Sequence, residues 1–343
     1  MVIGTLISLF VYASAACIFA FMWAPLLIKT LIKLKMGKSI RLASETPVFA
    51  TMHAKKQGTP TMGGILVWAT VVLFTLVPLA LENYIPGFFS RNETLLPLGA
   101  LIASALVGLL DDYLNVRRIG AHGGGIRGRH RLLLYTLIAI IGALWFFVKL
   151  EWDIIRIPFV GIIDLGWYYV PFFVLTIVAT SFSTNEADGL DGLAGGLLLA
   201  AYAAYGAIAF AQGKYDLATF CAVIAGALLA FLWYNINPAR FFMGDTGAMS
   251  LGVTLGIVAM LTNYPLLLPI ICFPFLLESL SVIIQLTSKK LRKGKRVFKS
   301  APIHHHFEAI GWTEPQIVMR FWMIAGVCGV LGVAIALTDM LAY

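Results

Sequence analysis

The sequence predicts an all-α polytopic membrane protein, with about ten transmembrane helices in a single domain over residues 1–343. Of the 343 residues, 60% are hydrophobic and only 12% are charged, whereas about a quarter of the residues of a soluble domain are charged. Apolar runs approaching the 20 or so residues that cross a bilayer recur along the whole chain. The four cysteines lie inside these runs, so we interpret them as small apolar residues and not as a disulfide or metal framework.

Ten apolar segments follow one another without an internal repeat or a linker. The first continues to about Leu34 and lacks a basic leader, which favours a membrane span over a cleavable signal peptide. Only a few polar residues separate the fifth segment from the sixth. The predicted segments lie near residues 3–28, 62–82, 95–112, 132–150, 168–185, 192–212, 217–235, 246–262, 264–287 and 320–341.

Positive charge gathers on one side of this arrangement. Of the 25 Lys and Arg residues, 21 fall in one alternating set of loops, and the other set holds Arg91, Lys149, Arg156 and Lys214. The positive-inside rule makes the richer side cytoplasmic and places both termini outside. The net charge of +8 is therefore a cytoplasmic charge, suited to lipid headgroups and to an anionic substrate.

Polar residues that could carry chemistry also gather in the cytoplasmic segments. All six histidines fall there, as do five aspartates at or near helix ends: Asp111, Asp112, Asp188, Asp191 and Asp245. Five anions at one depth repel each other, so we expect a divalent metal or neighbouring Lys and Arg to hold them together. A set of carboxylate oxygens suits Mg²⁺ or Mn²⁺.

Two motifs lie in loops that could contact a ligand. KKQGTPTMGG (residues 55–64) could offer ammonium groups, including Lys56, and backbone N–H groups to a phosphate; it could equally be an ordinary basic loop. In NEADGLDG (residues 185–192), Asp188 and Asp191 share one face of a helical turn. A simple polar hairpin would not need Asn185, a glutamate and two aspartates together.

Two further motifs lie later in the chain. In NINPARFFMGDTG (residues 235–247), Asp245 suits a helix cap, but capping does not account for Asn235 or for the aromatic pair, which could stack a nucleobase. In PIHHHFE (residues 302–308), three consecutive histidines point in different directions, which favours anion contact or acid–base work over a zinc site. Glu278, inside the ninth segment, either pairs with a buried donor or lines a pocket.

The motifs KKQGTPTMGG, LVGLLDDYL, ADGLDGLAGG, FFMGDTG and APIHHHFE, in this order, resemble those of the bacterial phospho-N-acetylmuramoyl-pentapeptide transferase family. This family belongs to the polyprenyl-phosphate N-acetylhexosamine-1-phosphate transferases. The resemblance runs from about His53 to Arg320. It implies transfer of phospho-MurNAc-pentapeptide from UDP-MurNAc-pentapeptide to undecaprenyl phosphate, which gives lipid I and UMP in peptidoglycan synthesis. It also implies a Mg²⁺ cofactor, a homodimer and a place in the bacterial cytoplasmic (inner) membrane among its lipids, with no nucleic acid partner.

The resemblance assigns roles to individual residues. Asp245 resembles the magnesium ligand, Asp111 resembles the base that deprotonates the lipid phosphate, and Asp112 lies close by in the catalytic site. The positions that match substrate-binding residues are Lys56, Asn185, Asp188, Asp191, Asn235, Phe242, His304, His305 and His306. Two alternatives stay open: a sister activity on UDP-N-acetylglucosamine, and a secondary transporter, whose polar site would lie nearer the bilayer midplane. The chemistry could be a direct displacement with Asp111 as base, or a two-step route through a phosphorylated aspartate.

Three positions depart from the family pattern. Asn115 replaces a common lysine, Arg131 replaces a lysine in the following basic stretch, and Phe182 replaces an asparagine. The loss of the first lysine removes one phosphate contact, whose charge Arg117 or Arg118 could replace, although without its geometry.

Overall fold

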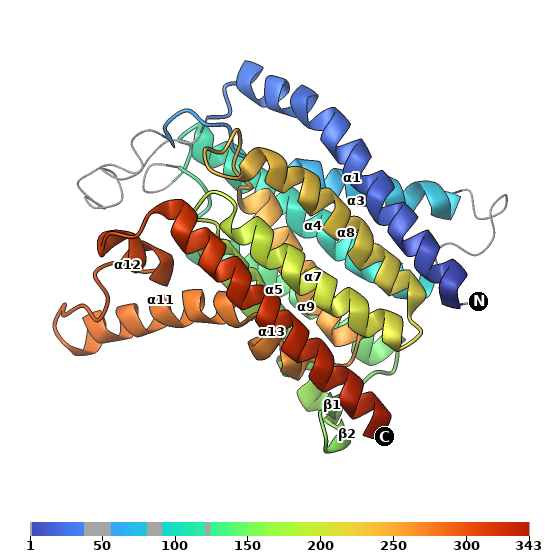
Figure 1. Cartoon of the computed structure of the whole chain (residues 1–343). Helices are drawn as coiled ribbons and strands as arrows, with labels where there is room; N and C mark the ends of the chain where they lie inside the picture. The colour runs from blue at the N-terminus through green and yellow to red at the C-terminus, as the bar shows by residue number, and fades with distance from the viewer. Residues whose placement is uncertain (1, 38–55, 81–90, 121–123, 343) are drawn as a thin grey trace.

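The computed structural model describes residues 2–37, 56–80, 91–120 and 124–342, so His53, Lys55 and His122 lie outside the described residues. The described chain is a bundle of long helices (Figure 1). The helices are α1 (Val2–Lys33), α3 (Gly64–Ala80), α4 (Arg91–Val116), α5 (Gly128–Leu144), α6 (Tyr169–Ala187), α7 (Leu193–Ala211), α8 (Tyr215–Asn235), α9 (Asp245–Leu261), α10 (Leu268–Ile271), α11 (Phe273–Leu291), α12 (Ile303–Ala309) and α13 (Glu314–Ala342). Short helical turns, η2 (Trp145–Lys149), η3 (Gly166–Tyr168) and η4 (Pro265–Leu267), extend or precede some of them.

The multi-spanning character is confirmed, because seven helices of the described chain are long and apolar enough to cross a membrane. An eighth crossing is added if the bent pair Pro265–Ile271 and Phe273–Leu291 is one span, and Gly64–Val77 and Asp245–Leu261 are shorter apolar helices. Each of the ten predicted segments contains a helix, and in the described parts of the chain seven or eight of them meet the length and composition expected of a crossing.

The ninth predicted segment, 264–287, is not one straight helix, which corrects the sequence prediction. It breaks at Cys272, where the two pieces meet at 85°. Pro274 lies in the first turn of α11, where a missing N–H group breaks no helical hydrogen bond. A new helix can therefore start after the break.

A β-hairpin also departs from the predicted all-α fold. Its strands β1 (Ile154–Ile157) and β2 (Gly161–Asp164) are antiparallel and lie between the fourth and fifth predicted segments. Four-residue strands are too short to show a clear period in the sequence. The buried Asp339 of α13 accepts hydrogen bonds from the Phe159 backbone N–H (2.7 Å) and from the Arg156 side chain, which ties the hairpin to the end of the last helix.

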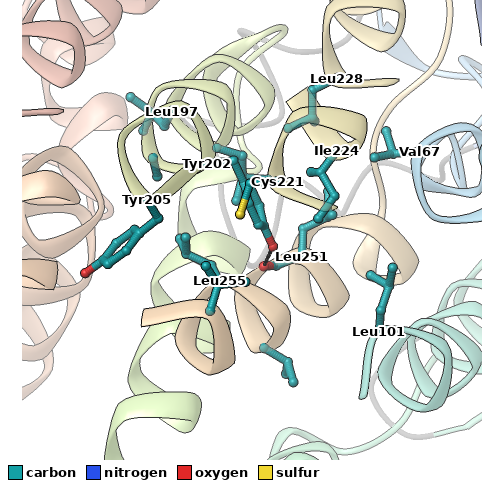
Figure 2. Close-up of a cluster of buried hydrophobic side chains, with 14 of the residues drawn as sticks. Val67, Leu101, Leu197, Tyr202, Tyr205, Cys221, Ile224, Leu228, Leu251 and Leu255 are labelled. Carbon is teal, nitrogen blue, oxygen red and sulfur yellow. Dashed lines mark hydrogen bonds between the residues drawn. The ribbon is translucent and has the colours of Figure 1, made fainter. Parts of the chain in front are cut away.

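Helix α9 forms the centre of the bundle. Every residue after Asp245 in this helix is buried, and α3, α4, α6 and α7 all contact it. Figure 2 shows part of this core, where side chains from α3, α4, α7, α8 and α9 meet. There the Tyr202 hydroxyl donates a hydrogen bond to the Leu251 carbonyl (2.7 Å), which satisfies a polar group inside an apolar layer. Because protein and not lipid surrounds α9, this helix tolerates a length of 17 residues.

The two ends of the bundle differ. Both chain termini lie at the end away from α12 (Figure 1). At the α12 end, helices α4, α6 and α8 finish, and helices α5, α9 and α13 begin. The predicted site residues lie on these helix ends and on the loops between them, so the fold can bring them together.

Candidate functional site

The centre of the site is one arginine between two carboxylates. Nη1 of Arg131, near the start of α5, lies 3.0 Å from Asp111 Oδ2 and 2.5 Å from Asp245 Oδ2. Asp111 is buried, and it also accepts a hydrogen bond from the Ile126 backbone N–H. Because one nitrogen contacts both carboxylates, the two oxygens are no more than 5.5 Å apart. The positive charge of Arg131 thus lies between the two carboxylates, where it offsets the repulsion that we expected between them.

The cation between the carboxylates is Arg131, one of the three positions that depart from the family pattern, at the start of the next helix. Arg117, which with Arg118 could replace the charge of the missing lysine at position 115, lies over the Tyr113 ring, with its Cζ 5.6 Å from the ring centroid. The side chain of Asn115 is exposed.

The adjacent aspartates of α4 have different partners. Asp112 Oδ2 accepts a hydrogen bond from the backbone N–H of Thr246 (3.1 Å), so Asp112 caps the first turn of α9 from a neighbouring helix. Asp245 is not the cap of its own helix, because Gly244 occupies the N-cap position and Asp112 supplies the acceptor. Gly108 allows α4 to lie this close, since a Cβ there would be 2.5 Å from the Asp245 carbonyl oxygen. Asp111 and Asp112 therefore point to different partners.

The end of α6 and the loop after it complete this centre. Asn185 Nδ2 donates to Asp245 Oδ1 (2.8 Å), so both Asp245 oxygens have partners. Asp188 Oδ2 accepts from the backbone N–H of Gly244 (3.2 Å). The NEADGLDG motif is thus attached to the start of α9 at two points.

A second cluster surrounds Lys56, which precedes α3. Its ammonium nitrogen lies 2.6 Å from Asp191 Oδ1 and also pairs with Glu314 at the start of α13. The same nitrogen is 5.9 Å from the centroid of the Phe242 ring. The buried Asp191 accepts two more hydrogen bonds, from Asn237 Nδ2 (3.0 Å) and from the Ala239 backbone N–H (3.1 Å). Lys56, Asp191 and Phe242, which we predicted from three separate motifs, are therefore neighbours.

The two phenylalanines of the FFMGDTG motif differ in burial. Phe241 is fully buried and packs against the rings of Phe231 and Tyr234. Phe242 is half-buried beside Lys56, so it is the ring that could stack on a ligand. Asn235 uses its amide within the protein: it accepts from the Gly192 N–H (3.0 Å) and donates to the Phe241 carbonyl (2.9 Å). Asn235 thereby positions two loops of the site.

The three histidines lie on the short helix α12 and point to different partners, as predicted. His304 is fully buried, and its Nδ1 lies 2.9 Å from Glu278 Oε2 on α11. Of the two interpretations of Glu278, pairing with a buried partner is therefore confirmed. His305 Nδ1 lies 2.6 Å from Glu308 Oε2, and His306 Nδ1 accepts from the Lys299 backbone N–H (3.2 Å).

His304 connects α12 to the NEADGLDG loop. A Cβ at Gly189 would lie 2.3 Å from His304 Nε2, so only glycine allows this contact. Burial is the largest single effect and lowers the pKa of His304, but Glu278, with Glu308 and Glu186, raises it more in total, and the net pKa lies above its usual value near 6.5. His304 thus holds two predicted motifs against each other.

Sequence reasoning missed Glu314 and Asn237 as members of the site and treated Arg131 only as a departure. Glu314 lies in the first turn of a helix, where an acidic residue is ordinary, and Asn237 lies in a loop with several polar residues. Their partners are 123 and 46 residues away. No local pattern could have identified these contacts.

The donor atoms of the central cluster suit a hard cation. Among the described residues, no group of three or more His, Cys, Asp or Glu side chains is close enough to hold a metal ion. Oxygens of Asp111 and Asp245 lie close together on either side of Arg131, whereas Asn185 directs its Nδ2 group at Asp245. Mg²⁺ commonly takes only one or two carboxylates and fills its other positions with water and substrate phosphates. The carboxylates of Asp111 and Asp245 are ligands of this type, and Arg131 lies between them.

Comparison with known proteins gives two family matches. Residues 94–263 match glycosyl transferase family 4, and residues 56–66 match the phospho-N-acetylmuramoyl-pentapeptide-transferase signature 1. The phospho-N-acetylmuramoyl-pentapeptide-transferase of Chloroflexus aggregans is 40% identical over 89% of this chain and 83% of its own length. The enzyme of the same name from Listeria welshimeri is 40% identical over 94% of this chain and 97% of its own length.

Proposed function

The chain belongs to the phospho-N-acetylmuramoyl-pentapeptide-transferase family, and we propose that it transfers phospho-MurNAc-pentapeptide from UDP-MurNAc-pentapeptide to undecaprenyl phosphate. The products are lipid I and UMP. The observation that carries this proposal is the convergence of Asp111, Arg131 and Asp245 beside the Lys56–Phe242 pair. This arrangement places groups suited to phosphate chemistry next to groups suited to a nucleotide.

The nucleotide end of the donor would occupy the Lys56 cluster. A half-buried aromatic ring can stack on a base, and an ammonium group beside it can donate to uridine or phosphate oxygens. Phe242 and Lys56 supply these two groups, and the loop of Asp188 and Asp191 lies against them. We place His305 and His306 at the rim that closes on the sugar phosphate, and the buried His304 positions this rim against Gly189 of that loop.

The reaction would be a direct displacement at the phosphorus that carries the sugar. Asp111 accepts the proton of the lipid phosphate, the freed oxygen attacks this phosphorus, and the bond to the UMP oxygen breaks. Arg131 lies beside Asp111, where it can offset charge on the incoming phosphate. A bound Mg²⁺, held by Asp245, would neutralise negative charge on the diphosphate. Isolation of a phospho-sugar bound covalently to an aspartate would favour the two-step route instead.

The lipid chain has a suitable place between α6, α9, α10 and α11. A cavity of about 220 Å³ there is lined mainly by apolar side chains, including Phe172 of α6 and Phe275 of α11. Its lining continues along α6 to Thr184, next to Asn185, which contacts Asp245. The 85° break at Cys272 opens this space. A polyprenyl chain in this groove would bring its phosphate toward the two carboxylates.

We propose a topology of ten spans in a single domain, with both termini outside and the site facing the cytoplasm of the bacterial inner membrane. The charge count supports it, because 21 of 25 basic residues lie in the cytoplasmic set of loops. Both chain ends lie away from α12, which agrees with this orientation (Figure 1). A homodimer and dependence on Mg²⁺ complete the proposal.

The test is a transfer assay with the detergent-purified protein, labelled UDP-MurNAc-pentapeptide, undecaprenyl phosphate and Mg²⁺. We expect a labelled lipid product that is lost when EDTA replaces Mg²⁺. A parallel reaction with UDP-N-acetylglucosamine tests the sister activity. Intact protein that forms no lipid product would reject the transferase. The transporter alternative then becomes testable by uptake into vesicles, although the clustering of polar groups at one end of the bundle argues against it.

A further inference from the structure

Glu314, the first residue of α13, makes contacts that none of the predicted roles accounts for. Its Oε1 accepts hydrogen bonds from Lys56 Nζ and from the Asp191 backbone N–H (2.6 Å). Its Oε2 accepts from Asn237 Nδ2 (3.1 Å). The side chain is only 12% exposed. One carboxylate therefore connects three separate loops to the start of the last helix.

Asp191 contacts two of the same donors from the opposite side. Its carboxylate lies 2.6 Å from Lys56 Nζ and 3.0 Å from Asn237 Nδ2. The ammonium group of Lys56 thus lies between two carboxylates from distant parts of the chain. An ammonium group has three N–H donors. With two of them directed at Asp191 and Glu314, the direction of the third is set.

A second residue of α13 holds the same loop. Trp322 Nε1 donates to the Gly192 carbonyl (3.1 Å), one residue after the N–H that Glu314 accepts. The indole is packed closely, because a Cβ at Gly196 would lie 2.0 Å from Trp322 Nε1. The first turns of α13 therefore hold backbone groups of two consecutive residues of this loop, Asp191 and Gly192. Glu314 adds to this anchor a direct link to Lys56.

We propose that Glu314 is a positioning residue for the donor nucleotide: it holds Lys56 and the Asp191 backbone in the arrangement that binds the uridine diphosphate group. This inference rests on the proposed function. An acidic residue at a helix start could instead act only on the helix dipole, which would affect stability and not donor binding. The three contacts to site loops favour the positioning role.

Glutamine at position 314 would test the role with little change in shape. A glutamine has one acceptor oxygen and one donor NH₂ group, whereas Glu314 accepts at both oxygens. If the glutamine oxygen faces Lys56 and the Asp191 N–H, its NH₂ group faces Asn237 Nδ2, which is also a donor. A flip of the Asn237 amide would turn its oxygen toward the Asp191 carboxylate. The substitution therefore leaves one side of the cluster mismatched in either orientation.

The experiment compares the wild type with Glu314→Gln and Glu314→Ala in the transfer assay and in direct binding of UMP. We expect KM for UDP-MurNAc-pentapeptide and Kd for UMP to rise about tenfold, as for loss of one charge-assisted hydrogen bond. The KM for polyprenyl phosphate and kcat should change less than about twofold. In a Lys56→Met background, Glu314→Gln should add little, because the group it positions is absent.

The matched control is Gln316→Ala, which lies in the same turn of α13, is exposed and accepts from the Thr313 backbone N–H. It should leave both KM values and UMP binding unchanged. Donor KM and UMP Kd within about twofold of wild type in both Glu314 variants would overturn the inference. Equal loss of kcat and of affinity for both substrates, with a lower melting temperature, would also overturn it, since that pattern indicates a structural role. A wild type that binds UMP but transfers nothing would refute the proposed function and not this inference, which the UMP arm still decides.

Discussion

Replacement of Arg131 by glutamine should disable the reaction by leaving two carboxylates without their shared cation. The Asp111 and Asp245 oxygens are at most 5.5 Å apart, because each contacts the same guanidinium nitrogen. Two unit charges at that distance repel by about 0.8 kcal/mol in water and about 3 kcal/mol at an effective dielectric constant near 20. The Arg131 side chain is 29% exposed, so the true cost lies between these values. A cost of 1 to 3 kcal/mol corresponds to a loss of about five- to 150-fold in kcat/KM.

A lysine at the same position should recover most of the activity. Both carboxylates contact one nitrogen, Nη1, so the forked geometry of the guanidinium is not needed for either contact. An ammonium group can donate to two carboxylates at once. We therefore expect the kcat/KM of Arg131→Lys to be within about tenfold of the wild-type value, because the substitution lengthens one charge-assisted contact to a carboxylate and does not remove it.

The assay is lipid-product formation under saturating Mg²⁺, with Arg129→Gln as the control. Arg129 is exposed and lies on the same turn of α5, so this control removes the same charge outside the cluster. Near-normal kcat/KM in Arg131→Gln would refute the argument. An Arg131→Lys variant as inactive as Arg131→Gln would show that the guanidinium shape, and not the charge between the carboxylates, is required.

Three further substitutions test other parts of the site. Asp245→Asn should abolish turnover at millimolar Mg²⁺ while UMP binding persists, because a neutral amide is a weaker ligand for a hard cation; near-normal turnover would remove Asp245 from the metal site. Phe242→Ala should weaken UMP binding by about 1 to 3 kcal/mol, the usual value of one base–aromatic stack. As a control, Phe241→Ala should chiefly lower the melting temperature, since Phe241 is buried. Unchanged UMP affinity in Phe242→Ala would exclude stacking. Because the pKa of His304 is raised in the folded protein, the stability that its protonated form provides is fully present below about pH 6.5 and is lost as the pH rises through the raised pKa. Glu278→Gln should therefore flatten the fall in melting temperature above pH 6.5, and an identical pH profile in wild type and variant would show that this pair does not titrate there.

Much of the site could be predicted from the sequence because its residues lie in compact motifs at helix ends. Adjacent Asp111 and Asp112 point in directions about 100° apart on any helix, which predicted separate tasks; in the structure they have different partners, Arg131 and the Thr246 N–H. Apolar length predicted a helix in every segment. Length could not predict the break at Cys272, because a proline in the first turn of a helix looks the same in sequence as one that kinks it.

The sequence by itself determined that this protein is a multi-spanning membrane protein, that its charged and polar groups favour one side, and which family it resembles. These properties depend on the composition and on the order of residues within short segments, which are the same in the unfolded and the folded chain. Only the tertiary structure decided which groups meet: that Arg131 and not Arg117 lies between the carboxylates, that Asp112 caps a helix other than its own, and that Glu314 holds Lys56. Such contacts join residues far apart in the chain, and their geometry exists only after helix packing has brought the ends of the bundle together.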